Sequence, residues 1–202
     1  MAALDIFTTF PRITTERLVL RQIIPDDADA LYATFSDEAV MEFYGDEAHQ
    51  SLDDSRHLIH LQQEWYARHM GIRWGITRHG EDNVIGSCGL FNFDEEQRRA
   101  EVGYELRRVY WRQGIMREAL TAILSLAFGP MALHRVEALT DGRNTASQSI
   151  LASLGFIHEG TLRERFYFHG GYHDDWYFGL LSGDCPASAI AAVNYTLVEA
   201  VI

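Results

Sequence analysis

The sequence predicts one α/β domain in which helices cover both faces of a mixed, twisted, mostly antiparallel sheet. Three observations lead to this prediction. The chain has 202 residues, a length that suits a single domain. Its 47% hydrophobic and 23% charged residues are ordinary for a globular protein. Strand-like segments with short turns alternate with helical ones, and one long helix stands between two strands, which predicts a parallel pair inside the sheet.

The N-terminal part is predicted to hold one strand and two helices. Apolar and polar residues alternate over Leu18–Arg21, which is typical of a strand. Pro25–Asp27 has the proline and the acidic side chains of a first helical turn, and apolar residues continue along one face as far as Phe35. A second helical stretch covers Leu52–Arg68, and Gly71 is predicted to end it.

The middle of the chain is predicted to form an antiparallel meander. Three strand-like segments follow one another with short links, at Arg73–Thr77, Val84–Phe93 and Arg99–Leu106. The turns between them are predicted at residues 82–83 and 94–97, where Asp, Asn and Gln gather. Links this short favour antiparallel neighbours.

The C-terminal part adds two helices and three strands. The helices are predicted at Ile115–Phe128 and Ser147–Leu154, and the strands at His134–Thr140, Phe156–Phe168 and Tyr172–Leu181. Because the first of these helices is a crossover, the strands on either side of it should be parallel neighbours. Residues 1–182 are predicted to be the domain. The break at Gly183–Pro186 leaves residues 183–202 as an appendage or a dimer contact.

Charge and composition exclude several classes of protein. The 17 basic residues, all arginine, face 29 acidic ones, and this net charge of −12 disfavours nucleic acid and anionic lipid as partners. No apolar run is long enough for a membrane span, and Met1–Phe10 lacks the basic cluster of a signal peptide. Cys88 and Cys185 are far apart and are interpreted as free thiols. His57 and His60 have no third ligand that would predict a metal site. We therefore expect a cytoplasmic protein without a metal.

One segment predicts an anion site. Between the strand that ends at Leu106 and the helix that begins at Ile115, the turn Gln113–Arg117 holds a single glycine. Free N–H groups and the dipole at a helix N-terminus bind phosphate, and Gly114 lets a ligand approach the backbone. Six arginines crowd into this region: Arg98, Arg99, Arg107, Arg108, Arg112 and Arg117. An ordinary turn and a surface ion-pair network are the alternative interpretations.

The turn, taken with motifs before and after it, resembles the coenzyme-binding motif of the GNAT acetyltransferases. Within that superfamily the chain is similar to the ribosomal-protein N-terminal (alanine or serine) acetyltransferases. The matching segments are Thr15–Arg21 with Pro25–Ala28, Tyr110–Ala119, Asn144–Ser147, Leu154–Phe156 with Glu159-Gly160, and Tyr172–Asp174. The resemblance covers about residues 13–182. The motif departs from the usual pattern at Trp111, Arg112 and Met116.

The resemblance implies a GNAT acyltransferase fold and a bound acetyl-CoA. It implies that strand Arg99–Leu106 carries a bulge at its end and splays from His134–Thr140. Pantetheine would then pair with the backbone near Leu106–Val109, where an N–H serves as oxyanion hole. The implied coenzyme-binding residues are Leu106, Arg107, Arg108, Val109, Arg112, Gln113, Gly114, Ile115, Met116, Arg117, Asn144 and Ser147.

Catalytic roles implied by the resemblance are distributed over a few residues. Ser147 is a candidate donor to the coenzyme sulfur, and Asn144 either binds pantetheine amides or caps the short helix. The family's carboxylate position is taken by Phe166, so Glu101 and Glu164 are the candidate bases. A solvent-facing or ion-paired role is the alternative for both carboxylates. Several aromatic residues are interpreted as core or as wall of the acceptor pocket: Trp65, Tyr66, Trp74 and Phe91.

The predicted activity is transfer of an acetyl group from acetyl-CoA to a primary amine, by direct attack in a ternary complex. The acceptor is a protein N-terminus or a small cationic amine, and a homodimer is possible. A CoA-binding sensor or partner protein of the same fold, without turnover, is the alternative from a different class. An unrelated α/β protein with an incidental anion site is the third interpretation.

Overall fold

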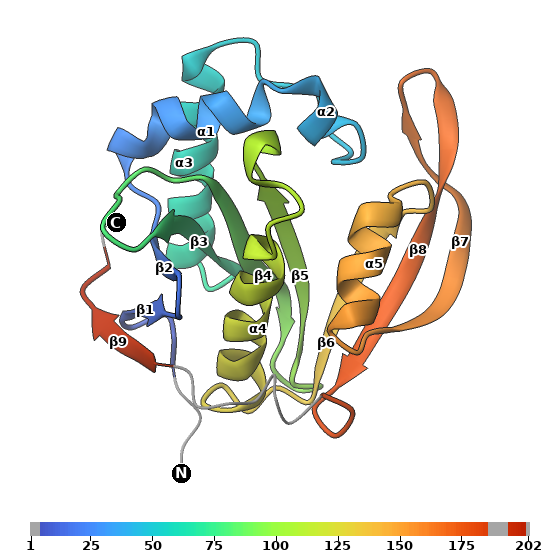
Figure 1. Cartoon of the computed structure of the whole chain (residues 1–202). Helices are drawn as coiled ribbons and strands as arrows, with labels where there is room; N and C mark the ends of the chain where they lie inside the picture. Colours follow the sequence, from blue (N-terminus) through green and yellow to red (C-terminus); the bar gives the residue numbers. More distant parts are fainter. Residues whose placement is uncertain (1–4, 186–193, 201–202) are drawn as a thin grey trace.

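A computed structural model describes residues 5–185 and 194–200, and in these residues nine strands form one sheet (Figure 1). The strand order is β7-β8-β6-β5-β4-β3-β2-β1-β9. The strands are β1 (Phe10–Thr14), β2 (Leu18–Gln22), β3 (Gly71–Arg78), β4 (Gly86–Asp94), β5 (Arg99–Leu106), β6 (Arg135–Asp141), β7 (Ile157–Phe168), β8 (Gly171–Leu181) and β9 (Asn194–Val198). All neighbouring pairs are antiparallel except β5 and β6, which confirms the predicted parallel pair.

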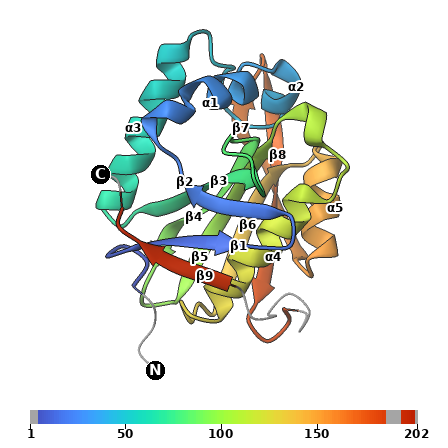
Figure 2. The ribbon, with the colours of Figure 1, turned by 60° about the vertical axis from the view of Figure 1, so that its left-hand side comes forward.

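Helices lie on both faces of this sheet, as predicted. They are α1 (Ala28–Phe35), α2 (Glu38–Met41), α3 (Leu52–Ala67), α4 (Ile115–Phe128) and α5 (Thr145–Ser153), with 3-10 turns at Pro25–Asp27 and Arg108–Tyr110. Figure 2 shows α1 and α3 on one side of the sheet and α4 and α5 on the other. The core is built around α4, where Leu120, Ile123 and Leu124 are at most 1% exposed.

Two strands and one helix were not predicted. β1 contains Pro11 and pairs with β2 over only two residues. β9 is mostly exposed. Neither strand shows a strict alternation of buried and exposed residues. β9 lies in the predicted appendage and pairs with β1, so this part of the tail extends the sheet of the same chain. Residues 186–193, 201 and 202 of the appendage lie outside the described residues.

The predicted end of α3 at Gly71 is wrong. The helix ends at Ala67, and His69 takes the left-handed conformation with φ 57°. Gly71 already begins β3, where a Cβ atom would lie 3.3 Å from the Leu90 carbonyl oxygen and 3.2 Å from the Phe91 Cβ. The glycine therefore allows β3 and β4 to approach closely at this position.

The predicted divergence of β5 from β6 is confirmed. The two strands pair only over Arg99–Glu101 with Arg135–Glu137, although both continue for several residues. The predicted bulge at the end of β5 is not found, because its pairing with β4 stays regular from Glu101 to Leu106. The irregularity lies between Phe91 and Asp94 on β4, where Asn92 has φ 52°.

A buried ion pair fixes β2 against the turn before α1. The Arg21 guanidinium donates to both carboxylate oxygens of Asp27 at 2.8 Å, and its Nε donates to Asp82 Oδ1 at 2.7 Å. Arg21 is 9% exposed and Asp27 is 6% exposed. Asp27 also accepts the Ile24 N–H at 2.9 Å. A pair buried this deeply is costly to break from one side.

Candidate active site

A cavity of about 850 Å³ lies where β5 and β6 diverge. Its walls come from both faces of the sheet, because the opening passes between the two strands. Tyr104, Asn144 and Ser147 line it on the side of α5. The opposite side is lined by aromatic and charged side chains, which include Phe43, Tyr44, Trp65, Arg73, Phe91, Glu101, Arg165, Phe166 and Asp175. Trp65 and Phe91 thus line the cavity, whereas Tyr66 and Trp74 belong to the core.

The turn before α4 takes a left-handed backbone conformation at two residues. Gly114 is the N-cap of the helix with φ 74°, a left-handed value that favours glycine, and Arg112 has φ 59°. Among the described residues, a Cβ atom on Gly114 would come within 4 Å of the Arg17 Nη2 alone, at 3.4 Å. Gln113 and Gly114 are exposed, whereas Ile115 and Met116 turn their side chains into the core. The N–H groups at this end are therefore accessible to a ligand.

The arginine cluster divides into structural residues and available ones. Arg99 pairs with Glu137 at 2.9 Å, Arg108 pairs with Asp37 at 3.0 Å, and Arg107 donates to the Ala30 carbonyl at 3.1 Å. Within the described residues Arg112 and Arg117 make no ion pair or side-chain hydrogen bond, and both are exposed beside Gly114. Two of the six arginines, Arg99 and Arg108, are thus ion-paired, and Arg112 and Arg117 leave positive charge at the turn.

Backbone groups at the end of β5 face the opening. Arg107 donates its N–H to the Ile85 carbonyl on the β4 side at 2.9 Å. Alternation along a strand then directs the backbone groups of Tyr104 and Leu106 to the other side, toward β6. The Leu106 carbonyl accepts a hydrogen bond from the Trp111 indole at 2.6 Å. Trp111, an atypical residue of the motif, therefore braces the strand end from which pantetheine contacts are predicted, and Val109 beyond it is 70% exposed.

Ser147 and Tyr104 form a hydroxyl pair in the cavity. Their oxygens are 2.8 Å apart, and either group can donate. Burial raises the pKa of Tyr104 to about 12, although the hydrogen bond from Ser147 opposes the shift, so the phenol stays protonated. Asn144 caps α5, because its side chain accepts the Ser147 N–H at 3.0 Å. The capping role considered for Asn144 is therefore present, and it also orients Ser147.

Of the two candidate bases, one lines the cavity. Glu101 is half-buried there and accepts a hydrogen bond from the Asn92 side-chain amide at 3.1 Å. Burial raises the pKa of Glu101, and the charge of Glu137 adds to the shift. Glu164 is exposed in the irregular part of β7 with φ 50°, and it is not part of the cavity wall. The next two residues, Arg165 and Phe166, do line the cavity.

A polar cluster at the cavity wall was not predicted from the sequence. Arg73 on β3 donates to Ser87 on β4 at 2.6 Å and forms an ion pair with Glu105 on β5, to which Ser87 also donates. Tyr44 reaches the same carboxylate from the segment after α2. Burial raises the pKa of Glu105, and the Arg73 charge opposes that shift. The signal in the sequence was one charged residue in each of two predicted strands, Arg73 in the first and Glu105 in the third strand of the meander.

A second contact holds the segment after α2 over the opening. The Arg143 guanidinium lies 5.5 Å from the centroid of the Phe43 ring, and the same arginine is ion-paired with Asp141 at the end of β6.

Among the described residues, no three His, Cys, Asp or Glu side chains gather into a metal-binding group. No helix in residues 5–185 or 194–200 combines the length and hydropathy that a membrane crossing requires.

The sheet opens along one parallel strand pair, and a glycine-capped helix N-terminus follows β5, which is the arrangement that the resemblance to the acetyltransferases implies. The chain belongs to the GNAT family within this class, because the acetyltransferase (GNAT) domain profile matches residues 17–157. The enzyme is therefore an N-acetyltransferase, and the predicted recognition and fold are confirmed.

Known proteins similar to this chain support the assignment. The N-acetyltransferase YoaA of Bacillus subtilis is 37% identical over 165 residues, which are 82% of this chain and 93% of that protein. The ribosomal protein uS5-alanine N-acetyltransferase of Escherichia coli is 26% identical over 168 residues, 81% of this chain and 87% of the relative. A Vibrio cholerae spermidine N-acetyltransferase, solved with CoA and spermine, has the same fold. Its TM-score is 0.74 at 21% identity, over 84% of this chain and 98% of that one.

Proposed function

We propose that this enzyme transfers the acetyl group of acetyl-CoA to a primary amine, by direct attack within a ternary complex. The observation that carries the proposal is the opening between β5 and β6, because its cavity reaches from Asn144 and Ser147 beside α5 to a side lined by carboxylates. Arg112, Arg117 and the N–H groups at Gly114 hold the pyrophosphate. Pantetheine extends along the free edge of β5 toward Tyr104.

The chemistry divides between the two sides of the cavity. Glu101 accepts the proton of the acceptor ammonium, directly or through a water, so that the neutral amine attacks the thioester carbonyl. A backbone N–H at the end of β5 stabilises the oxyanion. When the C–S bond breaks, Ser147 donates its hydroxyl proton to the departing thiolate, and Tyr104 replaces that proton through the 2.8 Å contact. The attacking nitrogen releases its second proton to solvent as the tetrahedral intermediate collapses, and solvent returns a proton to the Tyr104 phenol.

The acceptor is proposed to be cationic before it reacts. Glu101 and Asp175 line the acceptor side together with aromatic rings, and burial raises the pKa of both carboxyl groups, which gives them affinity for a proton-donating ammonium. Aromatic faces stabilise cations as well. A protein N-terminus and a small polyamine both meet this description. The relatives that act on uS5 alanine and on spermidine represent these two classes.

Titration calorimetry with CoA and a thiol-release assay over amines test the proposal. The panel contains spermidine, lysine and short peptides with N-terminal alanine or serine. We expect micromolar CoA binding and thiol release with one class of amine. The chain contains no lysine, so intact mass can report acetylation of the acceptor with little interference from self-acetylation.

Two outcomes contradict the proposal in different ways. Absence of CoA binding at high micromolar concentration excludes the acetyl-CoA assignment. Binding without thiol release across the whole panel, in the presence of an intact Ser147, favours a CoA-binding sensor or partner protein instead. Retention of full activity by Ser147→Ala excludes only the proposed proton donor.

A further inference from the structure

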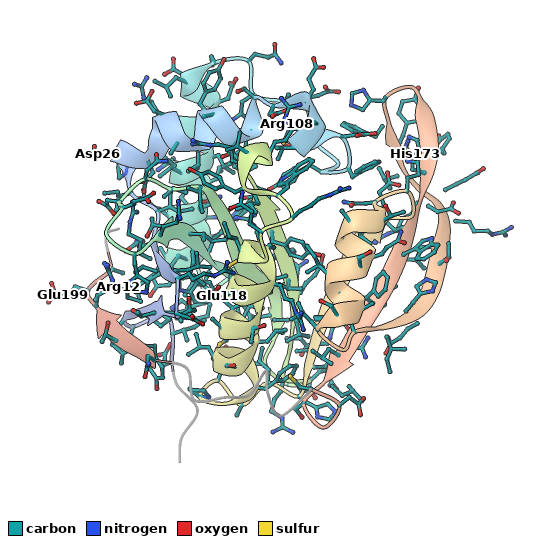
Figure 3. The ribbon with its side chains drawn as sticks, in the orientation of Figure 1. Arg12, Asp26, Arg108, Glu118, His173 and Glu199 are labelled. Carbon is teal, nitrogen blue, oxygen red and sulfur yellow. The ribbon has the colours of Figure 1, made fainter. Side chains whose placement is uncertain are left out.

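Two motifs that lie about a hundred residues apart in the sequence meet beside the coenzyme turn. Thr15 and Arg17 stand in the turn between β1 and β2, and Glu118 stands in the first turn of α4. The Thr15 hydroxyl donates to Glu118 Oε1 at 2.6 Å, and the Arg17 N–H donates to the same oxygen at 2.9 Å. The Arg17 Nε donates to Glu118 Oε2 at 2.6 Å. Figure 3 labels Glu118 on the side of α4 that faces β1 and β2.

The same arginine holds the turn itself. Its Nη1 donates to the Gln113 carbonyl oxygen at 3.0 Å. In a trans peptide the C=O and the following N–H point in opposite directions. A Gln113 carbonyl directed at Arg17 therefore directs the Gly114 N–H away from β1 and β2, toward the exposed side of the turn.

Glu118 brings a negative charge close to a proposed anion site, and its partners compensate that charge. Burial raises the pKa of Glu118, but hydrogen bonds from Thr15 and Arg17 outweigh this and leave the pKa lowered. The carboxylate is thus ionised at neutral pH. Its contact with Arg17 cancels the repulsion that it would otherwise exert on a phosphate.

We propose that Thr15, Arg17 and Glu118 form a clamp that orients the Gln113–Gly114 peptide for the coenzyme pyrophosphate. All three are positioning residues, because they act through the turn and not on the acetyl group. The inference rests on the proposed function, since it requires CoA at this turn.

The test uses full-length variants and two donors. Arg17→Gln removes the charge and loosens the Gln113 carbonyl, and it leaves Glu118 uncompensated. We expect CoA affinity, measured by calorimetry, to fall about tenfold or more. Glu118→Gln keeps the Arg17 contact with Gln113 and should lose only about threefold. The double variant should bind CoA better than Arg17→Gln alone, because the uncompensated charge is gone.

Acetyl-pantetheine lacks the pyrophosphate, so it separates the clamp from a merely structural role. A structural defect would lower kcat/KM with both donors, whereas loss of the clamp should lower kcat/KM with acetyl-CoA more. For Arg17→Gln, kcat/KM with acetyl-CoA should fall about tenfold relative to kcat/KM with acetyl-pantetheine. The KM of the amine should not change. Arg56→Gln, which breaks an exposed 2.7 Å pair with Asp53 on α3, is the matched control and should change neither ratio.

Equal losses with both donors, or an unchanged CoA affinity in Arg17→Gln, overturn the clamp. If Arg17→Gln does not fold, Thr15→Val supplies the test. It removes one hydroxyl donor, and the expected result is about a threefold loss confined to acetyl-CoA. A wild-type enzyme that does not bind CoA refutes the proposed function itself, and wild-type binding that the variants retain refutes only the clamp.

Discussion

Replacement of Gly114 tests the coenzyme site most directly. Its φ of 74° is left-handed, and a side chain there has space, since a Cβ would meet only the Arg17 Nη2 at 3.4 Å. The penalty of any L-residue at this position is therefore mainly the backbone strain of about 1–2 kcal/mol. The Gly114→Gln variant carries this strain and an uncharged side chain, so its loss of CoA affinity gives the effect of both without a charge.

Gly114→Glu adds a charge to a side chain of the same shape. At about 6 Å and an effective dielectric constant of about 20, a carboxylate and one phosphate charge repel by about 3 kcal/mol. This repulsion corresponds to a roughly 100-fold loss of affinity beyond that of the glutamine variant. Thermal unfolding of the free protein should differ little between the two variants, because the charge matters only when the anion is bound.

Calorimetry with CoA at two salt concentrations separates strain from charge. The difference between Gly114→Glu and Gly114→Gln should narrow at high salt, because exposed charges are screened. The two dissociation constants should differ by about two orders of magnitude at low salt. If they are equal, no phosphate lies at the turn, and the reasoning from its geometry fails.

Three further predictions concern the cavity and the frame around it. Tyr104→Phe keeps the ring and removes the hydroxyl, so kcat should fall at least tenfold while the amine KM stays within about twofold; unchanged kcat would contradict the relay. Glu101→Gln should lower kcat. In the wild-type enzyme kcat should decline as the pH falls below the raised pKa of Glu101, since a base must be deprotonated to act, and the variant should lose this decline. A pH–rate profile checks this, and an unchanged acidic limb would exclude Glu101. Asp27→Asn leaves the buried Arg21 with the exposed Asp82 as its remaining carboxylate partner and should destabilise the fold by about 3 kcal/mol in urea unfolding. Asp53→Asn breaks the exposed pair with Arg56 and should lower the free energy of unfolding by under about 1 kcal/mol. Similar losses for Asp27→Asn and Asp53→Asn would contradict the argument from burial.

Elements with marked ends were predictable from the sequence. β5 and α4 coincide with their predicted bounds, because polar turn residues precede Arg99 and glycines lie on both sides of Ile115–Phe128. β1 was missed since Pro11 lowers the strand signal, although Pro11 has a place there: its carbonyl accepts the Trp74 indole at 2.6 Å. α2 has four residues, too few for a periodic pattern.

The turn side of the proposed site was more predictable than its cavity. The turn at Gly114 is a local motif, so residue types and spacing locate it once the motifs before and after it are considered. Tyr104 meets Ser147 only because β5 lies beside α5 in the folded protein, and no spacing along the chain reveals this contact. Arg73 and Glu105 likewise meet across three strands whose register is a property of the sheet. For the same reason, the choice between Glu101 and Glu164 needed the path of β7.

The pairing of β1 with β9 has a consequence for how the chain acquires this fold. Thr14 pairs with Asn194, so one edge of the sheet is completed by segments from opposite ends of the described chain. During synthesis the outer edge of β1 has no strand to pair with until residues 194–198 emerge. An open edge of this kind can accept a strand from a neighbouring molecule. Two copies that exchanged β9 would each keep an intact opening between β5 and β6, because the five strands from β5 to β1 separate β9 from β6.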